Sequence, residues 1–446
     1  MRAQSEIPTL INARWVVPVE PAGAVLEYHS VAVRDGGIEA VLPTPQAQQR
    51  YSGYAAVELA DHVLIPGLIN LHTHAAMTLL RGLADDLPLM RWLEEHVWPA
   101  EARHVSAQFV RDGTLIACAE MLRGGITCFN DMYFYPEAAV EAALESGMRG
   151  SFGMIVIDYP TAYASDADDY LAKGLALRDR HRDNPLLSFC LAPHAPYTVS
   201  DPTFVKIATL AAELDVPIHC HIHETADEIA RSMVEHGVRP LERLRRLGIA
   251  GPALIAVHSV HLSPDEIAML AAHGCSVAHC PSSNLKLASG FAPIAALVAA
   301  GVNVGLGTDG AASNNRLDAL QEMRQAALLA KAVAGDAQAV PAHAALAMAT
   351  LAGARALGLD KRIGSILPGK RADLAAVRLA GPELSPVFDP VSHLVYSAGR
   401  EHVSHVWVDG HPRMADRVLK HMDIQGLDTR AKLWQNIVRV RDQAIS

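Results

Sequence analysis

The chain has no uninterrupted apolar stretch long enough to cross a bilayer, although half of its 446 residues are hydrophobic. The segment Met1 to Leu10 shows no basic region followed by an apolar run, so no secretory signal is visible. The six cysteines are scattered and form no Cys-x-x-Cys pair, which favours reduced core residues over disulfides or a zinc knuckle. These absences predict a cytoplasmic protein with no membrane partner.

Charge and sequence complexity exclude further classes of protein. Only 19% of the residues are charged, and the formal net charge of -10 comes without a long basic run. Nucleic acid is therefore not expected as a partner. The chain also lacks low-complexity tracts, and it is long enough to bury a sizeable core. We therefore expect an ordinary globular protein.

Apolar segments of strand length alternate with helical segments through the middle of the chain. Eight strands are expected there, at 65–72, 125–131, 149–157, 186–194, 216–222, 253–259, 274–280 and 302–309. Helical segments separate or follow them, for example at 202–214, 226–247, 316–333 and 343–358. Eight strand–helix units favour an α/β fold with a closed parallel (β/α)₈ TIM-like barrel over an open sheet.

The two ends of the chain are β-rich instead. Residues 9–19 alternate in the manner of a strand, and 30–42 are a hairpin candidate broken by Asp35-Gly36-Gly37. Further strands are expected at 375–379 and 405–408. Each end is too small to fold well alone, so we expect both to pair into one small β-sandwich. The predicted domains are a barrel, at 66–365, and a β-sandwich with its tail, at 1–65 and 366–446.

Histidines and carboxylates stand at five of the eight expected strand ends, which form the active-site rim of such a barrel. The first strand ends in His72-Thr73-His74, whose histidines point to one face because strand residues i and i+2 do so. A lone histidine is more commonly a hydrogen-bonded core residue, but five groups on one rim favour a functional site. The other strand ends contribute His194, the run from His219 to Glu224, His258 and Asp309.

Three imidazoles and one carboxylate suit a borderline cation such as Zn²⁺, with water completing its shell. Such an ion lowers the pKa of bound water from about 15.7 towards about 7 and makes hydroxide available at neutral pH. His219, His221 and His223 share one face of an ideal strand, so spacing alone leaves the choice among them open. Glu224 follows the strand end, where it can carry a proton instead of binding the metal.

Other motif interpretations fit less well. Residues 305–310 match the G-x-G-x-x-G dinucleotide fingerprint, but they follow the last strand and place Asp309 where a pyrophosphate would sit. The signatures H-E-x-x-H and H-x-E…P-C-x-x-C are missing, which disfavours a thermolysin-like protease and a cytidine-deaminase fold. The basic run 361–371 is typical of a solvated turn.

Taken together, these motifs resemble the amidohydrolase superfamily. They are most similar to those of the 5-methylthioadenosine/S-adenosylhomocysteine deaminases, which are related to the chlorohydrolases. The similarity covers nearly the whole chain, through the segments 66–74, 77–82, 284–287, 307–315 and 368–374. The metal motifs are specific for the superfamily, and the segment 307–315 is more particular to the deaminases.

The resemblance implies one Zn²⁺ ion per chain, with the ligands His72, His74, His221 and Asp309. In the family's His-x-x-Glu motif the ligand precedes the acid by three residues, which selects His221 and Glu224. The implied catalytic residues are Glu224, His258 and Asp309. A fourth strand that ends in His194, with no lysine, fits the one-metal members. The implied substrate contacts are Glu101 on the ribose hydroxyls, His194 and Glu224 on the purine, Trp92 in the pocket wall and Ser313 near the base.

The implied reaction is hydrolytic deamination of the adenine ring of 5′-methylthioadenosine, which yields 5′-methylthioinosine and ammonia. S-adenosylhomocysteine and adenosine are possible secondary substrates. Relatives that bind the homocysteine tail use arginines on and after the third strand, whereas this strand has only Arg149, at its start, and no arginine follows up to Lys173. An apolar methylthio group fits Met154 and its neighbours better than a charged tail does.

Two alternatives stay open at this point. One is a deaminase or chlorohydrolase for another heterocycle, such as guanine or a triazine, which would have no ribose for Glu101 to bind. The other is an inactive barrel scaffold without metal, which the complete set of ligands and Glu224 disfavours. We expect a small-molecule nucleoside as the ligand and a homo-oligomer as the assembly.

Overall fold

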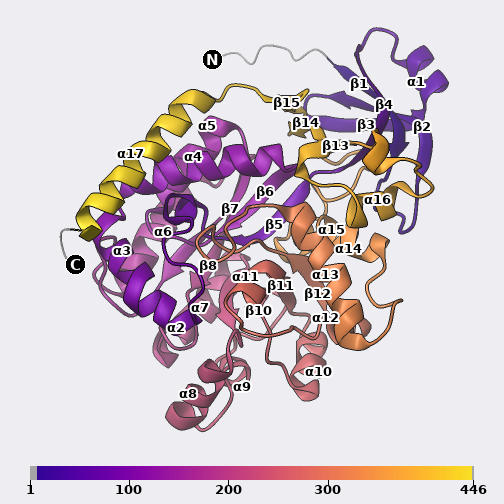
Figure 1. Cartoon of the computed structure of the whole chain (residues 1–446). Coiled ribbons are helices and arrows are strands. Elements are labelled where there is room, and N and C mark those ends of the chain that lie inside the picture. The colour runs from indigo at the N-terminus through magenta and orange to yellow at the C-terminus, as the bar shows by residue number, and fades with distance from the viewer. Residues whose placement is uncertain (1–7, 444–446) are drawn as a thin grey trace.

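The computed structural model of the chain describes residues 8–443, which form two β-sheets of eight strands each and the helices around them (Figure 1). Residues 1–7 and 444–446 lie outside the described part, and with them most of the segment searched for a secretory signal. Within 8–443, no helix has the length and apolar character needed to span a membrane. All six cysteines are buried and unpaired.

One sheet is the predicted barrel, and its strands pair in parallel in the order in which they occur along the chain. Every residue of its first three strands is buried. Strands covered on both faces are continuously apolar instead of alternating, which is why they stood out in the sequence. The strands are β5 (Leu68–Thr73), β6 (Ile126–Asp131), β7 (Arg149–Val156), β8 (Leu187–Pro193), β9 (Ile218–Ile222), β10 (Leu254–His258), β11 (Ser276–His279) and β12 (Asn303–Leu306).

Side chains close the barrel between its first and last strands. Asn70 on β5 donates from Nδ2 to Thr308 Oγ1 at 2.7 Å and accepts from the Thr308 amide at 2.9 Å. One residue on, the amide of Asp309 donates to the carbonyl of His72 at 3.0 Å. These bonds bring the end of β5 beside the segment after β12, and they place His72 next to Asp309.

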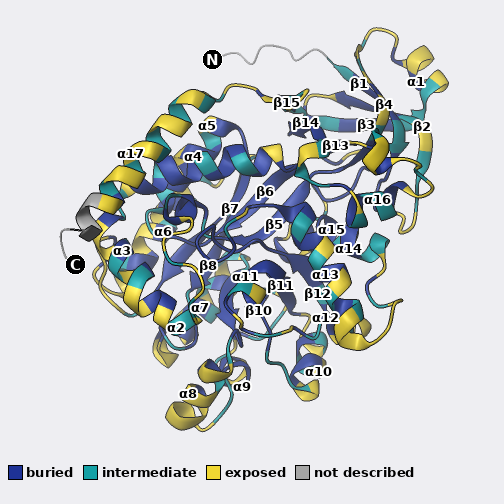
Figure 2. Ribbon diagram, in the orientation of Figure 1, coloured by how far each residue is buried: buried dark blue, intermediate teal, exposed yellow. Residues whose placement is uncertain are grey.

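Helices surround this sheet and keep their buried faces towards it (Figure 2). Two predicted helices are each divided in two: Gly237, with φ +69°, ends one before Pro240 begins the next, and Thr350 interrupts the other. The loop after β5 contains η1 (Ala75–Leu80), α2 (Leu89–Trp92), η2 (Leu93–Val97) and α3 (Trp98–His104). The others are α4 (Ala107–Arg123), α5 (Pro136–Ser146), α6 (Ala167–His181), α7 (Asp201–Leu214), α8 (Ala226–His236), α9 (Pro240–Arg246), α10 (Pro264–Ala272), α11 (Pro281–Lys286), α12 (Ile294–Ala299), α13 (Ala319–Ala334), α14 (Ala342–Met348) and α15 (Leu351–Ala356).

Both ends of the chain build the second sheet, as predicted. Its order is β16-β15-β14-β13-β4-β1-β2-β3, and β4 joins the two ends by pairing with β1 in parallel and β13 in antiparallel fashion. One face of this mixed sheet encloses its own core, which includes Ile11, Val33, Leu59, Leu374 and Trp407. The strands are β1 (Thr9–Val16), β2 (Leu26–Arg34), β3 (Gly37–Pro43), β4 (Ala55–Pro66), β13 (Leu374–Arg378), β14 (Val403–Val408), β15 (His411–Ala415) and β16 (Val418–Leu419).

Short helices and one long helix complete the terminal part. The long C-terminal helix α17 (Ile424–Gln443) lies along α4 of the barrel (Figure 1), where Trp434 Nε1 donates to Asp112 Oδ2 at 3.0 Å. The short helices are α1 (Thr44–Arg50), η3 (Pro382–Leu384), α16 (Pro390–Tyr396) and η4 (Arg400–His402).

The two sheets meet at the N-terminal ends of the barrel strands. Gly67 alone separates β4 from β5, and a Cβ atom at this position would lie 2.1 Å from Thr127 Oγ1, so a larger residue does not fit. Arg149, the first residue of β7, is buried and donates to Asp373 at 2.7 and 3.0 Å and to Asp409 at 3.1 Å. The terminal sheet thus holds one end of the barrel and leaves the C-terminal strand ends free.

Candidate active site

Five predicted side chains meet at the C-terminal ends of the barrel strands. His72 and His74 come from the end of β5, His221 from β9 and His258 from β10, while Asp309 follows β12. His72 Nε2 and His74 Nε2 each lie 3.3 Å from Asp309 Oδ1. In the triads His72–His221–His258 and His72–His74–Asp309, one potential ligand atom from each residue lies within 4.8 Å of the others. Such spacing allows one metal ion to be shared.

Hydrogen bonds to the far side of the imidazoles orient them for metal binding. His74 Nδ1 lies 2.6 Å from the carbonyl oxygen of Met132, and His221 Nδ1 lies 2.7 Å from that of His194. Because a carbonyl only accepts, each Nδ1 donates its proton, and each Nε2 keeps a free lone pair. His72 Nε2 is buried and has no hydrogen bond. A divalent cation fits this donor set of imidazole nitrogens and one carboxylate.

The structure places the three histidines of β9 and its end in different surroundings. His219 Nε2 lies 2.9 Å from His72 Nδ1, so it supports His72 from behind. His223 turns away, and its Nε2 accepts from the amide of Leu241 at 3.1 Å. Of the three, only His221 both belongs to a triad of potential metal ligands and lines the cavity. The left-handed conformation of His223, with φ +56°, sets it apart, while His219 lies two residues deeper along β9 than His221; spacing alone reveals neither difference.

Burial keeps two imidazoles of the cluster, those of His72 and His221, neutral. It lowers the pKa of His72 to about 4 and that of His221 well below its usual value. Burial alone would raise the pKa of Asp309, but the close approach of His72 and the neighbouring imidazoles holds it well below the usual range. Neutral imidazoles and an ionised carboxylate are the protonation states in which these groups bind metals.

Glu224 and His258 form a second pair beside the cluster. Glu224 Oε2 lies 3.6 Å from His258 Nε2, and His258 Nδ1 lies 2.8 Å from Asn284 Oδ1. Burial raises the pKa of Glu224, which favours a carboxyl group that can take up and release a proton. On the other side, Ser283 donates to Asp309 Oδ2 at 2.6 Å and leaves Oδ1 towards the histidines.

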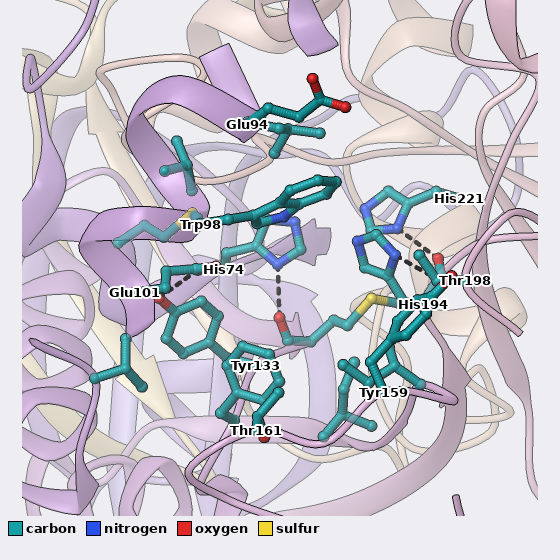
Figure 3. Close-up of a pocket in the computed structure, with 18 of the residues that line it drawn as sticks. His74, Glu94, Trp98, Glu101, Tyr133, Tyr159, Thr161, His194, Thr198 and His221 are labelled. Atoms are coloured by element: carbon teal, nitrogen blue, oxygen red, sulfur yellow. Dashed lines mark hydrogen bonds between the residues drawn. The ribbon is translucent and has the colours of Figure 1, made fainter. Parts of the chain in front are cut away.

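A cavity of about 760 Å³ opens over these residues, within the size range of small-molecule sites. Figure 3 shows His74, Glu101 and Tyr133 on one side of it and His194 and His221 on the other. Aromatic and aliphatic side chains form most of the remaining wall. The cavity brings together four of the predicted substrate contacts: Trp92, Glu101, His194 and Glu224.

Glu101 reaches the cavity from α3 with one carboxylate oxygen already bound. Tyr133 donates its hydroxyl proton to Glu101 Oε1 at 2.7 Å. Burial raises the pKa of Glu101 to about 7, although this bond acts in the opposite direction. The second oxygen remains available to accept hydrogen bonds from a ligand. His194, in contrast, is held neutral by burial, which lowers its pKa to about 3.

Two predicted contacts lie elsewhere. Ser313 is buried, donates to the carbonyl of Gly310 at 3.1 Å and is not among the described residues that line the cavity. Met154 is also buried outside the cavity, whose wall contains Ile155 and Ile157 instead. Side chains alternate between the two faces of a strand, so the methionine is directed away from the position expected of it.

Sequence reasoning missed two residues that the structure brings to the site, and the role of a third. Tyr133 follows β6, and inspection of the end of that strand would have found it, because rim residues of a barrel come from strand ends. His219 was weighed only as a ligand and not as support for His72. Arg231 lines the cavity from α8, well past a strand end, and no local pattern marks it.

Comparison with known proteins assigns the chain to a family. Residues 63–413 match the Amidohydrolase family. The chain belongs to this family. The predicted resemblance is confirmed, as is the assignment of the chain to the metal-dependent hydrolases.

Relatives within the family share nearly the full length. The chain is 47% identical over 437 residues to a 5-methylthioadenosine/S-adenosylhomocysteine deaminase of Saccharophagus degradans, with 98% of both chains covered. It is 51% identical to an adenosine deaminase of Xanthomonas campestris solved with bound zinc, with a TM-score of 0.94 and coverage of 97% and 98%. An atrazine chlorohydrolase of Arthrobacter aurescens, at 24% identity, a TM-score of 0.90 and coverage of 96% and 100%, shares the fold.

Proposed function

We propose that this protein hydrolyses 5′-methylthioadenosine at C6 of the adenine ring, releasing ammonia and 5′-methylthioinosine. S-adenosylhomocysteine and adenosine are secondary substrates in this proposal. The observation that supports it best is the juxtaposition, in one cavity, of a metal-binding cluster, the buried acid Glu224 and the carboxylate Glu101. The names of the relatives, deaminases of adenine nucleosides, support the same substrate class.

The proposed cofactor is one Zn²⁺ ion per chain, held by His72, His74, His221 and Asp309. Two observations support this fit. His72 Nε2 and His74 Nε2 each lie 3.3 Å from Asp309 Oδ1. The Nδ1 bonds of His74 and His221 leave their Nε2 lone pairs free to bind a cation. When bound there, zinc would lower the pKa of water from about 15.7 towards about 7 and supply hydroxide at neutral pH. Zinc in the Xanthomonas campestris structure supports this choice of metal.

In the proposed mechanism, three groups of the chain move protons. Asp309 and His258 accept the proton of the attacking water. Glu224 protonates N1 of the purine and later helps to deliver a proton to the departing ammonia. The 3.6 Å separation of Glu224 and His258 supports proton exchange through a shared water or substrate atom. His194, kept neutral by burial, is suited to hydrogen bonding with the uncharged base.

The ribose and the 5′ group would be selected by different walls. Glu101 accepts hydrogen bonds from the two ribose hydroxyls, and the hydrogen bond from Tyr133 holds its carboxylate in place. Beyond C5′, Ile155, Ile157 and Tyr159 offer an apolar surface that suits a methylthio group. Trp92 forms part of the wall around the nucleoside.

Location and assembly stay predictions from the sequence. We propose that the protein acts in the cytoplasm and that it forms a homo-oligomer. Fractionation of the host cell and the mass of the purified protein in solution test the two statements separately.

A panel of candidate substrates tests the proposed activity. Purified protein loaded with zinc is incubated with 5′-methylthioadenosine, S-adenosylhomocysteine, adenosine, guanine and a chlorotriazine, and ammonia or chloride release is measured. We expect the highest kcat/KM with 5′-methylthioadenosine, and little activity with the two heterocycles, because they have no ribose for Glu101. Faster turnover of guanine or the triazine would refute the proposal and favour the alternative function.

A further inference from the structure

The turn that presents Glu224 to the cavity has an uncommon backbone conformation. His223, directly after β9, has φ +56°, which few residues other than glycine adopt. This rotation turns the His223 ring away from the metal cluster, and the next residue, Glu224, lines the cavity. The direction of the Glu224 side chain therefore depends on how firmly this turn is held.

A second buried carboxylate holds the turn. Glu228, on the first turn of α8, accepts the amide of His223 at Oε1 (3.1 Å) and the amide of Glu224 at Oε2 (2.9 Å). It is 8% exposed and is not among the described residues that line the cavity. Both carboxylate oxygens are thus used on consecutive backbone amides, and neither faces the substrate.

This arrangement differs from ordinary helix capping. The N-cap of α8 is Thr225, whose side chain accepts from the amide of Glu228 at 3.3 Å. In a capping box the glutamate at this third position would return to the N-cap amide. Glu228 reaches past Thr225 to the two preceding residues instead. The glutamate therefore fixes the strand-to-helix turn itself and not only the start of the helix.

Other elements bind the same turn from the opposite side. The carbonyl oxygen of His223 accepts the amides of Val260 and His261, at 3.0 and 3.1 Å, in the segment after β10. That segment follows His258, whose Nε2 lies 3.6 Å from Glu224 Oε2. Fixing the turn from both sides also fixes the distance between these two proton-carrying groups.

We infer that Glu228 is a positioning residue, which holds the turn at His223 so that Glu224 faces His258 and the reacting base. The inference rests on the proposed role of Glu224 as proton carrier. Glu228 acts through Glu224 alone and does not touch the substrate. Its loss should therefore affect the rate of the chemical step and leave substrate and metal binding nearly unchanged.

The test is a double-mutant cycle with Glu228→Gln and Glu224→Gln. A glutamine at 228 turns an NH₂ group towards one of the two amide donors, so one of the two bonds is lost. We expect kcat to fall about 10- to 100-fold, since small displacements of catalytic groups cost this much, with KM changed less than about threefold and zinc content unchanged. In the Glu224→Gln background, Glu228→Gln should lower kcat no further, because both act as one unit.

Two further variants separate positioning from folding. Glu228→Asp keeps the charge on a shorter side chain and should recover part of the lost kcat. Thr225→Ala removes the N-cap bond of the same helix but leaves both bonds of Glu228, and its kcat should stay within about threefold of wild type. Equal losses in Thr225→Ala and Glu228→Gln, or additive losses in the cycle, would overturn the inference.

A crystal structure of Glu228→Gln gives an answer that needs no substrate. We expect the Glu224 carboxylate to move away from His258 Nε2, beyond the 3.6 Å separation of the wild-type structure. An unchanged Glu224 position would refute the positioning role even if activity fell. If the proposed function itself were wrong, the result would be different: the wild-type protein would release no ammonia from any nucleoside.

Discussion

At the scale of single residues, the properties of the site depend on how burial and neighbouring groups shift the pKa of each carboxyl group and imidazole. Glu224 is 7% exposed, and burial raises its pKa, whereas Asp309 stays ionised against the histidines. Their surroundings thus suit the two carboxyl groups to the different roles proposed for them, Glu224 as a proton carrier and Asp309 as a metal ligand.

Replacing Glu224 by glutamine tests the role of proton transfer without changing the size of the side chain. The side chain keeps its size but cannot transfer a proton, so kcat should fall by at least about 10²-fold. Zinc content should not change, because Glu224 is not a proposed ligand. Glu213→Gln, on the exposed surface of α7, is the matched control and should retain full activity. Activity of Glu224→Gln within a few-fold of wild type would contradict the proposed role.

The pH dependence of KM tests the role of Glu101. Accepting two ribose hydroxyls requires the ionised carboxylate, and burial raises the pKa of Glu101 to about 7. The KM for nucleosides should therefore rise as the pH falls through about 7. Tyr133→Phe removes the hydroxyl that stabilises this carboxylate, so the rise should begin at higher pH. Initial rates from pH 5.5 to 8.5 measure both effects, with zinc content checked at each pH. A KM that is flat over this range would argue against Glu101 as the ribose ligand.

At the scale of elements, the strands were more predictable than the helices. All eight barrel strands were expected close to their observed positions, because burial on both faces makes most of their residues apolar. Helix breaks were missed at Gly237 and Thr350, since apolar periodicity continues across them. The packing of α17 on α4 depends on contacts such as Trp434 with Asp112, between residues far apart in the sequence.

The Arg149 ion pairs should be essential to the joint between the two sheets. Arg149→Met leaves Asp373 and Asp409 without this buried partner, which should cost about 3–5 kcal/mol of unfolding free energy. Urea unfolding followed by circular dichroism measures the loss. Arg182→Met, which removes an exposed arginine paired with Asp183, should change stability by less than about 1 kcal/mol. Equal stability of the two variants would show that the joint does not depend on Arg149.

At the scale of the whole molecule, the cavity is formed by loops that lie far apart in the sequence. The proposed ligand set was reached by family resemblance, since β9 and the residue after it offered three histidines of equal spacing. The supporting contacts of His219, Tyr133 and Glu228 could not be predicted, because each depends on how separate elements approach one another. The position of Arg231 in the cavity wall could not be predicted for the same reason.

The 5′ wall predicts a preference between two substrates. No arginine lies in the loop from Asp158 to Asp169, and the guanidinium of Arg231 is already paired with Glu235 at 2.9 Å. A homocysteine carboxylate would lack a free cationic partner, whose loss typically costs about 1.5–3 kcal/mol. We expect kcat/KM for 5′-methylthioadenosine to exceed that for S-adenosylhomocysteine by at least about tenfold. Equal values, with a loss confined to S-adenosylhomocysteine in Arg231→Ala, would assign the carboxylate to Arg231 instead.

The most direct test of the proposed function measures product formation as a function of bound zinc. Purified protein is stripped of metal with a chelator, titrated with Zn²⁺, and incubated with 5′-methylthioadenosine, while 5′-methylthioinosine and ammonia are measured by mass spectrometry and a coupled assay. We predict no product without metal, equal amounts of the two products with it, and activity that saturates at one zinc ion per chain. Saturation at two ions per chain, or loss of 5′-methylthioadenosine without 5′-methylthioinosine, would contradict the proposed one-metal deaminase.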